Sequence, residues 1–297
     1  MPDSHGSACQ TRKPDWLKTR LHKGEAFAEV ERIVAEHSLH TICSSGKCPN
    51  KAECWSRRTA TFMILGDVCT RNCRFCATRT GRPVPPDAAE PQHVAQSVRL
   101  MGLRHVVLTS VSRDDLPDRG AAHWAATVAA VRALNPEATI EILISDFDAL
   151  PALLDTVLAS KPDIIGHNIE TVRRLTSQVR SKAAYATSMS TLRYLARHGA
   201  TVKSGLMVGL GESGDEVAAT LADLRGAGVR IVTIGQYLQP SAEHFPVAEY
   251  VAPETFGHYR RMAAALGFDF CASAPLVRSS YLADEAAAIL RRQEGGE

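Results

Sequence analysis

The chain has 297 residues, of which 45% are apolar and 22% charged, a balance typical of one or two folded domains rather than a disordered segment. The formal net charge of +2 is too small to argue for nucleic-acid binding. No apolar run approaches the roughly 20 residues that cross a bilayer, and residues 1–16 resemble neither a signal peptide nor a transit peptide. The composition therefore predicts a cytoplasmic protein with no membrane segment.

From residue 59 onward, short β-rich runs alternate with helical patterns. The expected strands cover 60–65, 105–111, 139–144, 163–169, 201–208 and 229–235. Most of them are apolar on both faces, as parallel strands covered by helices are. The helices expected between them include 93–101, Ala121–Leu134, 187–198 and 215–226. This alternation predicts an α/β fold.

Six such βα units are fewer than the eight of a closed barrel, so we expect a partial (β/α)6 barrel that is open on one side. A doubly wound sheet is the rival arrangement, because the same alternation permits it. A helix over 26–37 precedes this rhythm and leads into a cysteine-bearing loop. We therefore expect an N-terminal extension over 1–58, a barrel over 59–272 and a C-terminal extension over 273–297.

Six of the eight cysteines fall into two groups of three within 34 residues of one another, whereas Cys9 and Cys271 stand apart. The six are Cys43, Cys48, Cys54, Cys69, Cys73 and Cys76. Because the cytosol keeps thiols reduced, such a cluster indicates metal binding or catalysis rather than disulfides.

The second trio, Cys69, Cys73 and Cys76, has the spacing C-x3-C-x2-C and directly follows the first expected strand. Structural zinc takes four ligands, and no fourth Cys or His lies nearby in the sequence. Three thiolates on a [4Fe-4S] cluster leave one iron open for a small molecule, and we favour this interpretation over zinc or buried thiols. The first trio, Cys43, Cys48 and Cys54, reads C-x4-C-x5-C; its spacing alone does not distinguish a cluster from zinc or from plain packing.

C-x3-C-x2-C with Phe75 before its last cysteine resembles the radical-SAM superfamily, and both trios together resemble the lipoyl synthase family. The likeness runs from about Lys13 to Tyr281. It includes the segments CPNKAECW, TATFMILGDVCTRNCRFCAT, VLTSVSRDDLPD, HNIETV, KSGLMVGLGE, GQYLQPS and PLVRSSY. The resemblance implies a radical-SAM type of barrel and two [4Fe-4S] clusters, of which the cluster on the second trio binds S-adenosylmethionine (SAM).

The resemblance further implies that the first trio holds an auxiliary cluster with a serine of the motif RSSY as its fourth ligand. Carried over by position this serine is Ser280, with Ser279 as the fallback. The family reaction inserts sulfur at carbons 6 and 8 of an octanoyl chain on a carrier lysine, and the auxiliary cluster is sacrificed as the sulfur donor. The implied partners are the octanoylated carrier domain or its peptide, an electron donor and an iron–sulfur carrier protein; we expect a monomer that binds neither nucleic acid nor membrane.

Polar residues at the expected strand ends are candidate contacts for SAM or the substrate lysine. They are Thr109, Ser110, Asn168, Glu170 and Lys203. Each of them taken alone is more often structural. The run Gly-Leu-Gly-Glu-Ser-Gly at 209–214 matches a dinucleotide-loop pattern only weakly, although its glycines would let backbone amides approach SAM.

Four arginines, Arg71, Arg74, Arg79 and Arg82, could form a basic patch for an acidic carrier or the SAM carboxylate, or simply a solvated loop. Two further functions stay open at this point. One is another radical-SAM enzyme whose extra cluster transfers electrons, and the other is an iron–sulfur or zinc-binding regulator.

Overall fold

The computed structural model describes residues 13–18, 24–57, 59–281, 283, 285, 286 and 288. Its helices are α1 (Glu25–Glu36), α2 (Ile42–Ser45), α3 (Lys51–Ser56), α4 (Glu90–Leu100), α5 (Ala121–Leu134), α6 (Pro151–Ala159), α7 (Arg173–Val179), α8 (Tyr185–Arg197), α9 (Gly214–Gly226) and α10 (Pro253–Ala265), with 3-10 turns η1 (Asp15–Leu17) and η2 (Phe147–Ala149). Its strands are β1 (His40–Thr41), β2 (Thr61–Ile64), β3 (Val68–Cys69), β4 (Arg79–Thr80), β5 (His105–Ser110), β6 (Thr139–Leu143), β7 (Ile164–Gly166), β8 (Val202–Val208), β9 (Ile231–Gln236) and β10 (Phe270–Ser273). Cys9 lies outside the described residues.

Eight strands form one curved sheet in the order β1-β2-β5-β6-β7-β8-β9-β10. All neighbours in it are parallel except β1 and β2. The order follows the chain without reversing, which excludes the doubly wound sheet, because that fold reverses its strand order at a switch point. In the described part of the chain β1 does not pair with β10, so the barrel is open and the predicted partial barrel is confirmed.

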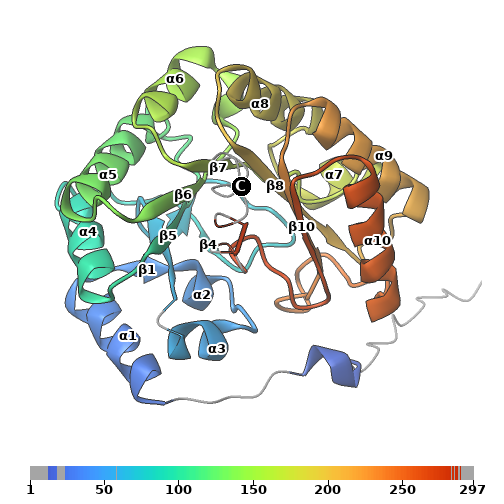
Figure 1. Ribbon diagram of the computed structural model, residues 1–297, viewed down its shortest axis with the longest axis horizontal. Helices are drawn as coiled ribbons and strands as arrows, with labels where there is room; N and C mark the ends of the chain where they lie inside the picture. Colours follow the sequence, from blue (N-terminus) through green and yellow to red (C-terminus); the bar gives the residue numbers. More distant parts are fainter. Residues whose placement is uncertain are drawn as a thin grey trace, which may run out of the picture.

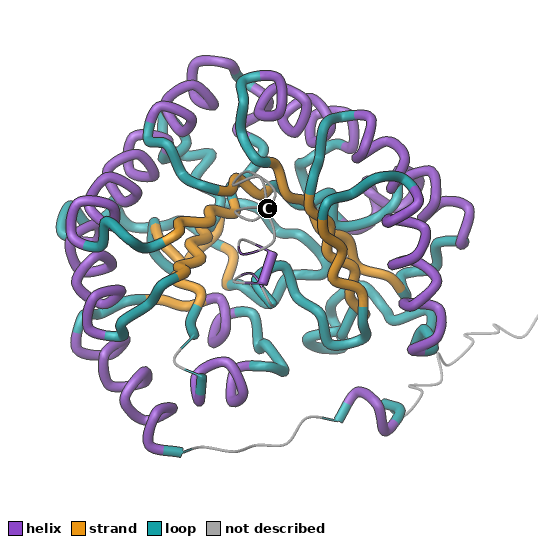
Figure 2. Tube along the Cα trace, in the orientation of Figure 1, coloured by secondary structure: helices purple, strands orange, loops and turns teal. Residues whose placement is uncertain are grey.

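The helices lie outside the strands and form a ring around them (Figure 1, Figure 2). The strands are buried on both faces because the helices cover one side and the barrel interior fills the other; every residue of β2 and β9, for example, is buried. Proline at the first turn of α4, α6 and α10 helps to start these helices, since the missing N–H would be unpaired there anyway. A capping box between Ser213 and Glu216 starts α9.

The six expected strands and their helices are all present, but the sheet has two edge strands that the sequence pattern did not predict. β1 has only two residues, and β10 mixes Phe270 and Cys271 with polar neighbours, so neither shows the apolar run of an inner strand. Cys271, which stands apart from the two trios in the sequence, lies in β10 and is partly exposed. Among the described residues no helix is long and apolar enough to span a bilayer.

The two chain extensions meet beside the open edge of the barrel. Helices α2 and α3 lie near the gap between β1 and β10, and the chain after β10 turns into the centre of the ring (Figure 1). Gly235 of β9 permits this path, because a Cβ there would lie only 2.1 Å from the backbone oxygen of Val277. The Asn50 side chain donates a hydrogen bond of 2.7 Å to the backbone oxygen of Leu276, joining the first cysteine loop to the C-terminal segment.

Candidate functional site

A cavity of about 300 Å³ opens at the carboxyl ends of the parallel strands, where barrel folds gather their functional side chains. The loop after β2 forms one wall, the ends of β5 to β9 form the floor, and the C-terminal segment forms another wall. Of the predicted site residues, the cavity lining contains Cys69, Cys73, Cys76, Thr109, Ser110, Asn168 and Glu170, together with Ser279. The structure therefore brings most of the predicted cofactor contacts to a single place.

The second cysteine trio lies on the loop between β3 and β4. Cys69 ends β3, and its Sγ accepts hydrogen bonds from the backbone N–H groups of Arg71 (3.4 Å) and Ser112 (3.3 Å). Cys73 Sγ lies 3.8 Å from the hydroxyl of Ser181. Burial raises the pKa of Cys76, and the nearby Cys73 and Cys69 thiolates raise this pKa further. Three neighbouring thiols of this kind fit a positively charged iron centre, which compensates the charge of their thiolates.

Asn168, Glu170, Thr109 and Ser110 line the cavity, but their roles there stay predictions. Burial raises the pKa of the Glu170 carboxyl, although Arg180 and the Asn168 amide oppose this rise. Glu170 also has a left-handed backbone with φ 68°, which is uncommon for a residue with a side chain and recurs at ligand sites. Thr109 donates a hydrogen bond to the backbone oxygen of Leu143 at 3.2 Å, so its hydroxyl proton is already used.

Lys203 does not line this cavity. It is the second residue of β8 and therefore lies toward the amino ends of the strands, away from the other candidates. Its ammonium group is buried and lies 2.6 Å from the carboxylate of Glu141, with which it forms an ion pair. The geometry thus gives Lys203 a structural partner in place of a ligand.

The glycine-rich turn at 209–214 is closed to an outside anion. The Glu212 carboxylate accepts hydrogen bonds from the backbone N–H groups of Gly209 (2.5 Å) and Leu210 (3.0 Å). Because the turn's own side chain occupies these amides, the expected approach of the amides to SAM is wrong for these two groups.

The four arginines of the cluster loop do not form one basic patch. Arg71 is buried, whereas Arg74, Arg79 and Arg82 are exposed. Arg79 pairs with Asp67 at 2.9 Å, and the Arg74 guanidinium stacks 5.0 Å from the centre of the Phe245 ring. Arg71, Arg74 and Arg79 thus differ in burial or in their partners, and closeness in the sequence does not gather these charges into one patch.

The first cysteine trio lies in α2, in the following loop and in α3. Burial raises the pKa of Cys54 to about 12, and the neighbouring Cys43 and Cys48 thiolates contribute to that rise. Burial also raises the pKa of Cys48, and Cys43 again adds to the effect. These three thiols are therefore near one another in a desolvated place, which fits a cationic cluster. The positive charge of Arg278 acts in the opposite direction and lowers the pKa of the Cys48 thiol.

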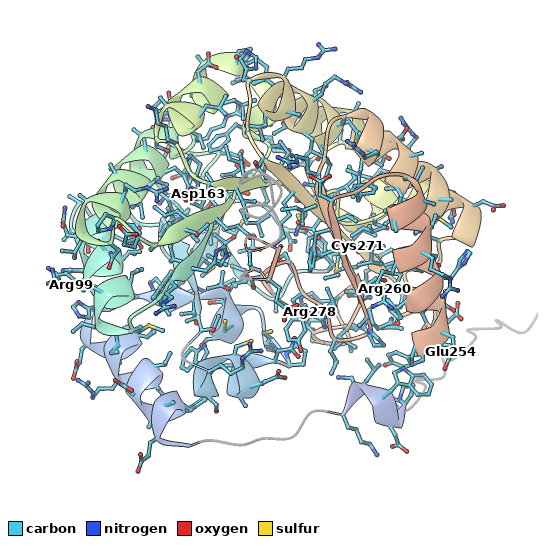
Figure 3. The ribbon with its side chains drawn as sticks, in the orientation of Figure 1. Arg99, Asp163, Glu254, Arg260, Cys271 and Arg278 are labelled. Atoms are coloured by element: carbon cyan, nitrogen blue, oxygen red, sulfur yellow. The ribbon has the colours of Figure 1, made fainter. Side chains whose placement is uncertain are left out.

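The motif Arg278-Ser279-Ser280-Tyr281 lies beside this trio. Arg278 lies on the chain that turns into the centre of the ring (Figure 3), and Tyr281 donates a hydrogen bond to Glu53 in α3 at 3.5 Å. Ser279 lines the cavity, whereas Ser280 is absent from its lining and is partly exposed. Both serines are thus within the segment that joins the two cysteine trios, and which of them binds iron stays a prediction.

The sequence analysis missed several polar residues of the cavity. His167 lies between the backbone oxygen of Ile144 (3.0 Å) and the hydroxyl of Ser188 (2.9 Å), and Arg180 donates to that hydroxyl at 2.8 Å. Arg180 directly follows α7 and Ser188 belongs to α8, and only the fold places them against His167. The sequence held no spacing signal that could have identified them.

The spacing of the thiols bears on the kind of metal centre they could hold. Among the described residues no three Cys, His, Asp or Glu side chains converge closely enough for a single metal ion. A [4Fe-4S] cluster separates its ligands more widely, since each thiolate binds a different iron.

The chain matches known proteins over almost its whole length. The model of the radical SAM superfamily matches residues 63–224. The lipoyl synthase of Parabacteroides distasonis is 57% identical over 92% of this chain and 98% of that protein. The lipoyl synthase of Chlorobium phaeovibrioides is 54% identical over 92% of this chain and 96% of that protein.

Solved structures support the fold alone. Methylornithine synthase (PylB) superposes with a TM-score of 0.53 at 14% identity, covering 93% of both chains. The [FeFe]-hydrogenase maturase HydG from Carboxydothermus hydrogenoformans superposes with a TM-score of 0.54 at 14% identity, covering 90% of this chain and 78% of that one. With the two cysteine trios, the open barrel and relatives above half identity along the chain, this protein belongs to the lipoyl synthase family of the radical SAM superfamily.

Proposed function

We propose that this protein inserts two sulfur atoms, at carbons 6 and 8, into an octanoyl chain that is amide-linked to a carrier lysine. The observation that supports this best is the placement of two cysteine trios on either side of one segment, 276–281, which also lines the cavity. A radical formed in the cavity and a sulfur source beside it would then react as neighbours within one site. Such proximity replaces a bimolecular encounter by an effectively intramolecular step.

The proposed ligand set follows the two trios. Cys69, Cys73 and Cys76 hold the cluster that binds SAM; when bound, these groups supply a 5′-deoxyadenosyl radical that abstracts hydrogen. The other contacts to SAM in this half of the site are proposed to come from side chains of the protein. Asn168 and Glu170 are proposed to orient SAM from the ends of β7, and Thr109 and Ser110 from the end of β5.

Cys43, Cys48, Cys54 and Ser280 are proposed to hold the second cluster, which serves as the sulfur substrate. A serine oxygen is a poorer partner for iron than a thiolate, so it can leave when sulfur is taken. The first trio is joined to the cavity wall by the hydrogen bond from Asn50 to Leu276, so the acyl chain would meet this cluster from the same cavity. In each of the two cycles a hydrogen leaves the acyl carbon on 5′-deoxyadenosine and sulfur takes its place.

We also propose a division of the chain into three parts, together with its cellular compartment and its partners. We assign 1–58 to an extension carrying the auxiliary cysteines, 59–272 to the barrel and 273–297 to the extension with the serine ligand. We further propose that the protein acts as a monomer. The seven described cysteines are free thiols, which suits the reducing cytoplasm. An electron donor and an iron–sulfur carrier that restores the spent cluster complete the proposed partners.

A single-turnover assay tests the function. Anaerobically reconstituted protein is mixed with SAM, dithionite and an octanoyl-lysine peptide, and the peptide is analysed by mass spectrometry. We expect a product with two added sulfur atoms. Cys48→Ala should still cleave SAM but add no sulfur, whereas Cys73→Ala should do neither. Sulfur-containing product from Cys48→Ala would refute the donor role of the auxiliary cluster. SAM cleavage with intact peptide and an intact auxiliary cluster would favour the electron-transfer alternative.

A further inference from the structure

The turn that follows β6 has an unusual backbone. Phe147, Asp148 and Ala149 are consecutive and have φ values of 45°, 50° and 54°. Left-handed backbone is disfavoured for residues with a Cβ, and single occurrences are the rule. Three in a row without glycine must therefore be held by their surroundings. Phe147 is fully buried, and the Ala149 N–H donates to the backbone oxygen of Asp146 at 2.8 Å, which closes the turn.

This turn presents carboxylates to the loop that carries the second cysteine trio. Asp146, directly before the left-handed residues, accepts hydrogen bonds from both terminal nitrogens of Arg71, at 3.0 Å (Nη1) and 2.8 Å (Nη2). Asp148, within the turn, lies 3.6 Å from the same guanidinium. The backbone oxygen of Asp146 accepts from Thr191 in α8 at 2.9 Å, so the turn is tied to the barrel wall as well. Strained backbone that is held in this way is a recurrent mark of functional sites.

The Arg71 guanidinium also donates hydrogen bonds to a second carboxylate. Asp114, after β5, accepts from Arg71 Nε at 2.8 Å and Nη2 at 2.9 Å. Arg71 thus binds one buried carboxylate, that of Asp146, and one partly exposed carboxylate, that of Asp114, from two different βα loops. Both contacts have the fork geometry that only arginine provides. The guanidinium side chain is only 5% exposed.

Arg71 lies between the first two cysteines of the trio, and its backbone is part of their environment. Its N–H donates to Cys69 Sγ at 3.4 Å, and its backbone oxygen accepts from the Thr80 hydroxyl at 3.2 Å. Any movement of the guanidinium would therefore move the loop at both Cys69 and Thr80. The ends of β5 and β6, which supply the two carboxylates, also supply Thr109, Ser110 and Leu143 to the cavity.

We propose that Arg71 is a positioning residue: gripped by Asp114 and Asp146, it aligns the cysteine loop with the strand ends that line the cavity. The inference rests on the proposed ligand set Cys69, Cys73 and Cys76. The left-handed turn and the residue before it supply one half of these contacts, through Asp146 and Asp148. In this arrangement the three thiols line the cavity before any cluster is inserted. The iron that binds SAM and the cavity residues proposed to orient SAM would then be aligned as soon as the cluster is in place.

The test compares the unchanged protein with Arg71→Lys, which keeps the charge but cannot grip two carboxylates, and with Asp146→Asn. Arg113→Lys is the matched control. Arg113 is also buried and binds Asp115 through two hydrogen bonds of 2.9 Å. Its Nη1 also donates to the backbone oxygen of Leu65 at 3.2 Å, but the side chains of the pair form no hydrogen bond with residues 69–80, the segment whose exchange is measured. Three measurements are made on each protein: amide hydrogen exchange of 69–80 without clusters, the EPR spectrum of the reduced holoprotein before and after SAM, and kcat and KM for SAM cleavage.

We expect Arg71→Lys and Asp146→Asn to bind iron and keep their circular dichroism, while exchange at 69–80 becomes at least tenfold faster. The KM for SAM should rise at least tenfold, and the SAM-induced change of the EPR spectrum should weaken. Loss of the SAM-binding cluster alone, with the auxiliary cluster retained, would also support the proposal.

The proposal is overturned if Arg71→Lys matches Arg113→Lys in loop exchange, EPR response and KM, since a pair that only stabilises the fold would behave in that way. Loss of both clusters with the fold intact would overturn it too. If the unchanged protein fails to cleave SAM, the proposed function fails instead, and the exchange data on the cluster-free protein still decide the role of Arg71.

Discussion

The buried pair of Lys203 and Glu141 offers a sharp test of the structure, because the sequence pattern had suggested a ligand contact for this lysine. At 2.6 Å the attraction between the charges is about 6 kcal/mol for an effective dielectric constant of about 20. Burial would raise the pKa of Glu141, but Lys203 and His105 hold that pKa below its usual value. We predict that Lys203→Met lowers the free energy of unfolding by about 3–5 kcal/mol, because it leaves a buried carboxylate without its cation.

Thermal melting of the reconstituted protein, followed by circular dichroism, measures this effect. A loss of this size corresponds to a midpoint roughly 6–20 °C lower for a domain of about this length. The double variant Lys203→Met with Glu141→Gln should recover most of the loss, since no buried charge then remains. The single variant should lose less at pH 5 than at pH 8, because the isolated carboxyl takes up a proton. At a permissive temperature SAM cleavage should be unchanged.

Two results would refute this reasoning. If Lys203→Met melts within 1 °C of the unchanged protein, the ion pair does not hold the strands as the geometry indicates. If the midpoint is unchanged and the KM for SAM rises, Lys203 contacts the cofactor after all.

Three further predictions concern other parts of the fold. Burial and the charge of Arg180 lower the pKa of His167 to about 4, so the unfolded chain takes up a proton at this residue at a higher pH than the folded chain does. The free energy of unfolding should therefore fall by about 3 kcal/mol between pH 6.5 and pH 4. In urea unfolding, the dependence of this free energy on pH should be shallower for His167→Gln. An equal slope in both proteins would contradict the assignment. Gly235→Ala should force away the backbone at Val277 and cost sulfur insertion while SAM cleavage continues; unchanged lipoyl product in the single-turnover assay would count against the close approach. Ser213→Ala should remove the helix cap of α9 and lower the free energy of unfolding by about 1 kcal/mol, measured in urea, without affecting SAM cleavage; a loss of SAM cleavage in this variant would be incompatible with a purely local role.

The inner strands of the barrel were predictable because burial on both faces leaves a continuous apolar run in the sequence. β1 and β10 were not, since an edge strand needs no such run; Cys271 in β10, for example, is only partly buried. The order of the strands could be inferred only from chain continuity, and the open edge was expected from the number of βα units. The structure adds the antiparallel β1, which extends the sheet beyond the barrel units.

The site was predictable where one motif carries several ligands, and less so where partners are distant in the chain. Cys69 and Cys73 appear together in one loop, but Asp146 is 75 residues from Arg71 and no spacing connects them. Lys203 was grouped with strand-end residues because it belongs to a strand with functional neighbours. The strand's direction decides the matter: its second residue lies at the amino end, opposite the cavity.

The hydrogen bond from Asn50 to Leu276 joins residues that are 226 positions apart in the chain. A ribosome that adds about 5–20 residues per second needs roughly 10–45 s to bridge that interval. The first cysteine trio therefore leaves the ribosome well before the segment with the proposed serine ligand. During this time the thiols are exposed to oxidants and to stray metal ions without their closing wall. The proposed auxiliary cluster can consequently be completed only after the barrel has been synthesised, and expression conditions that delay synthesis should lower its iron content before they affect the barrel.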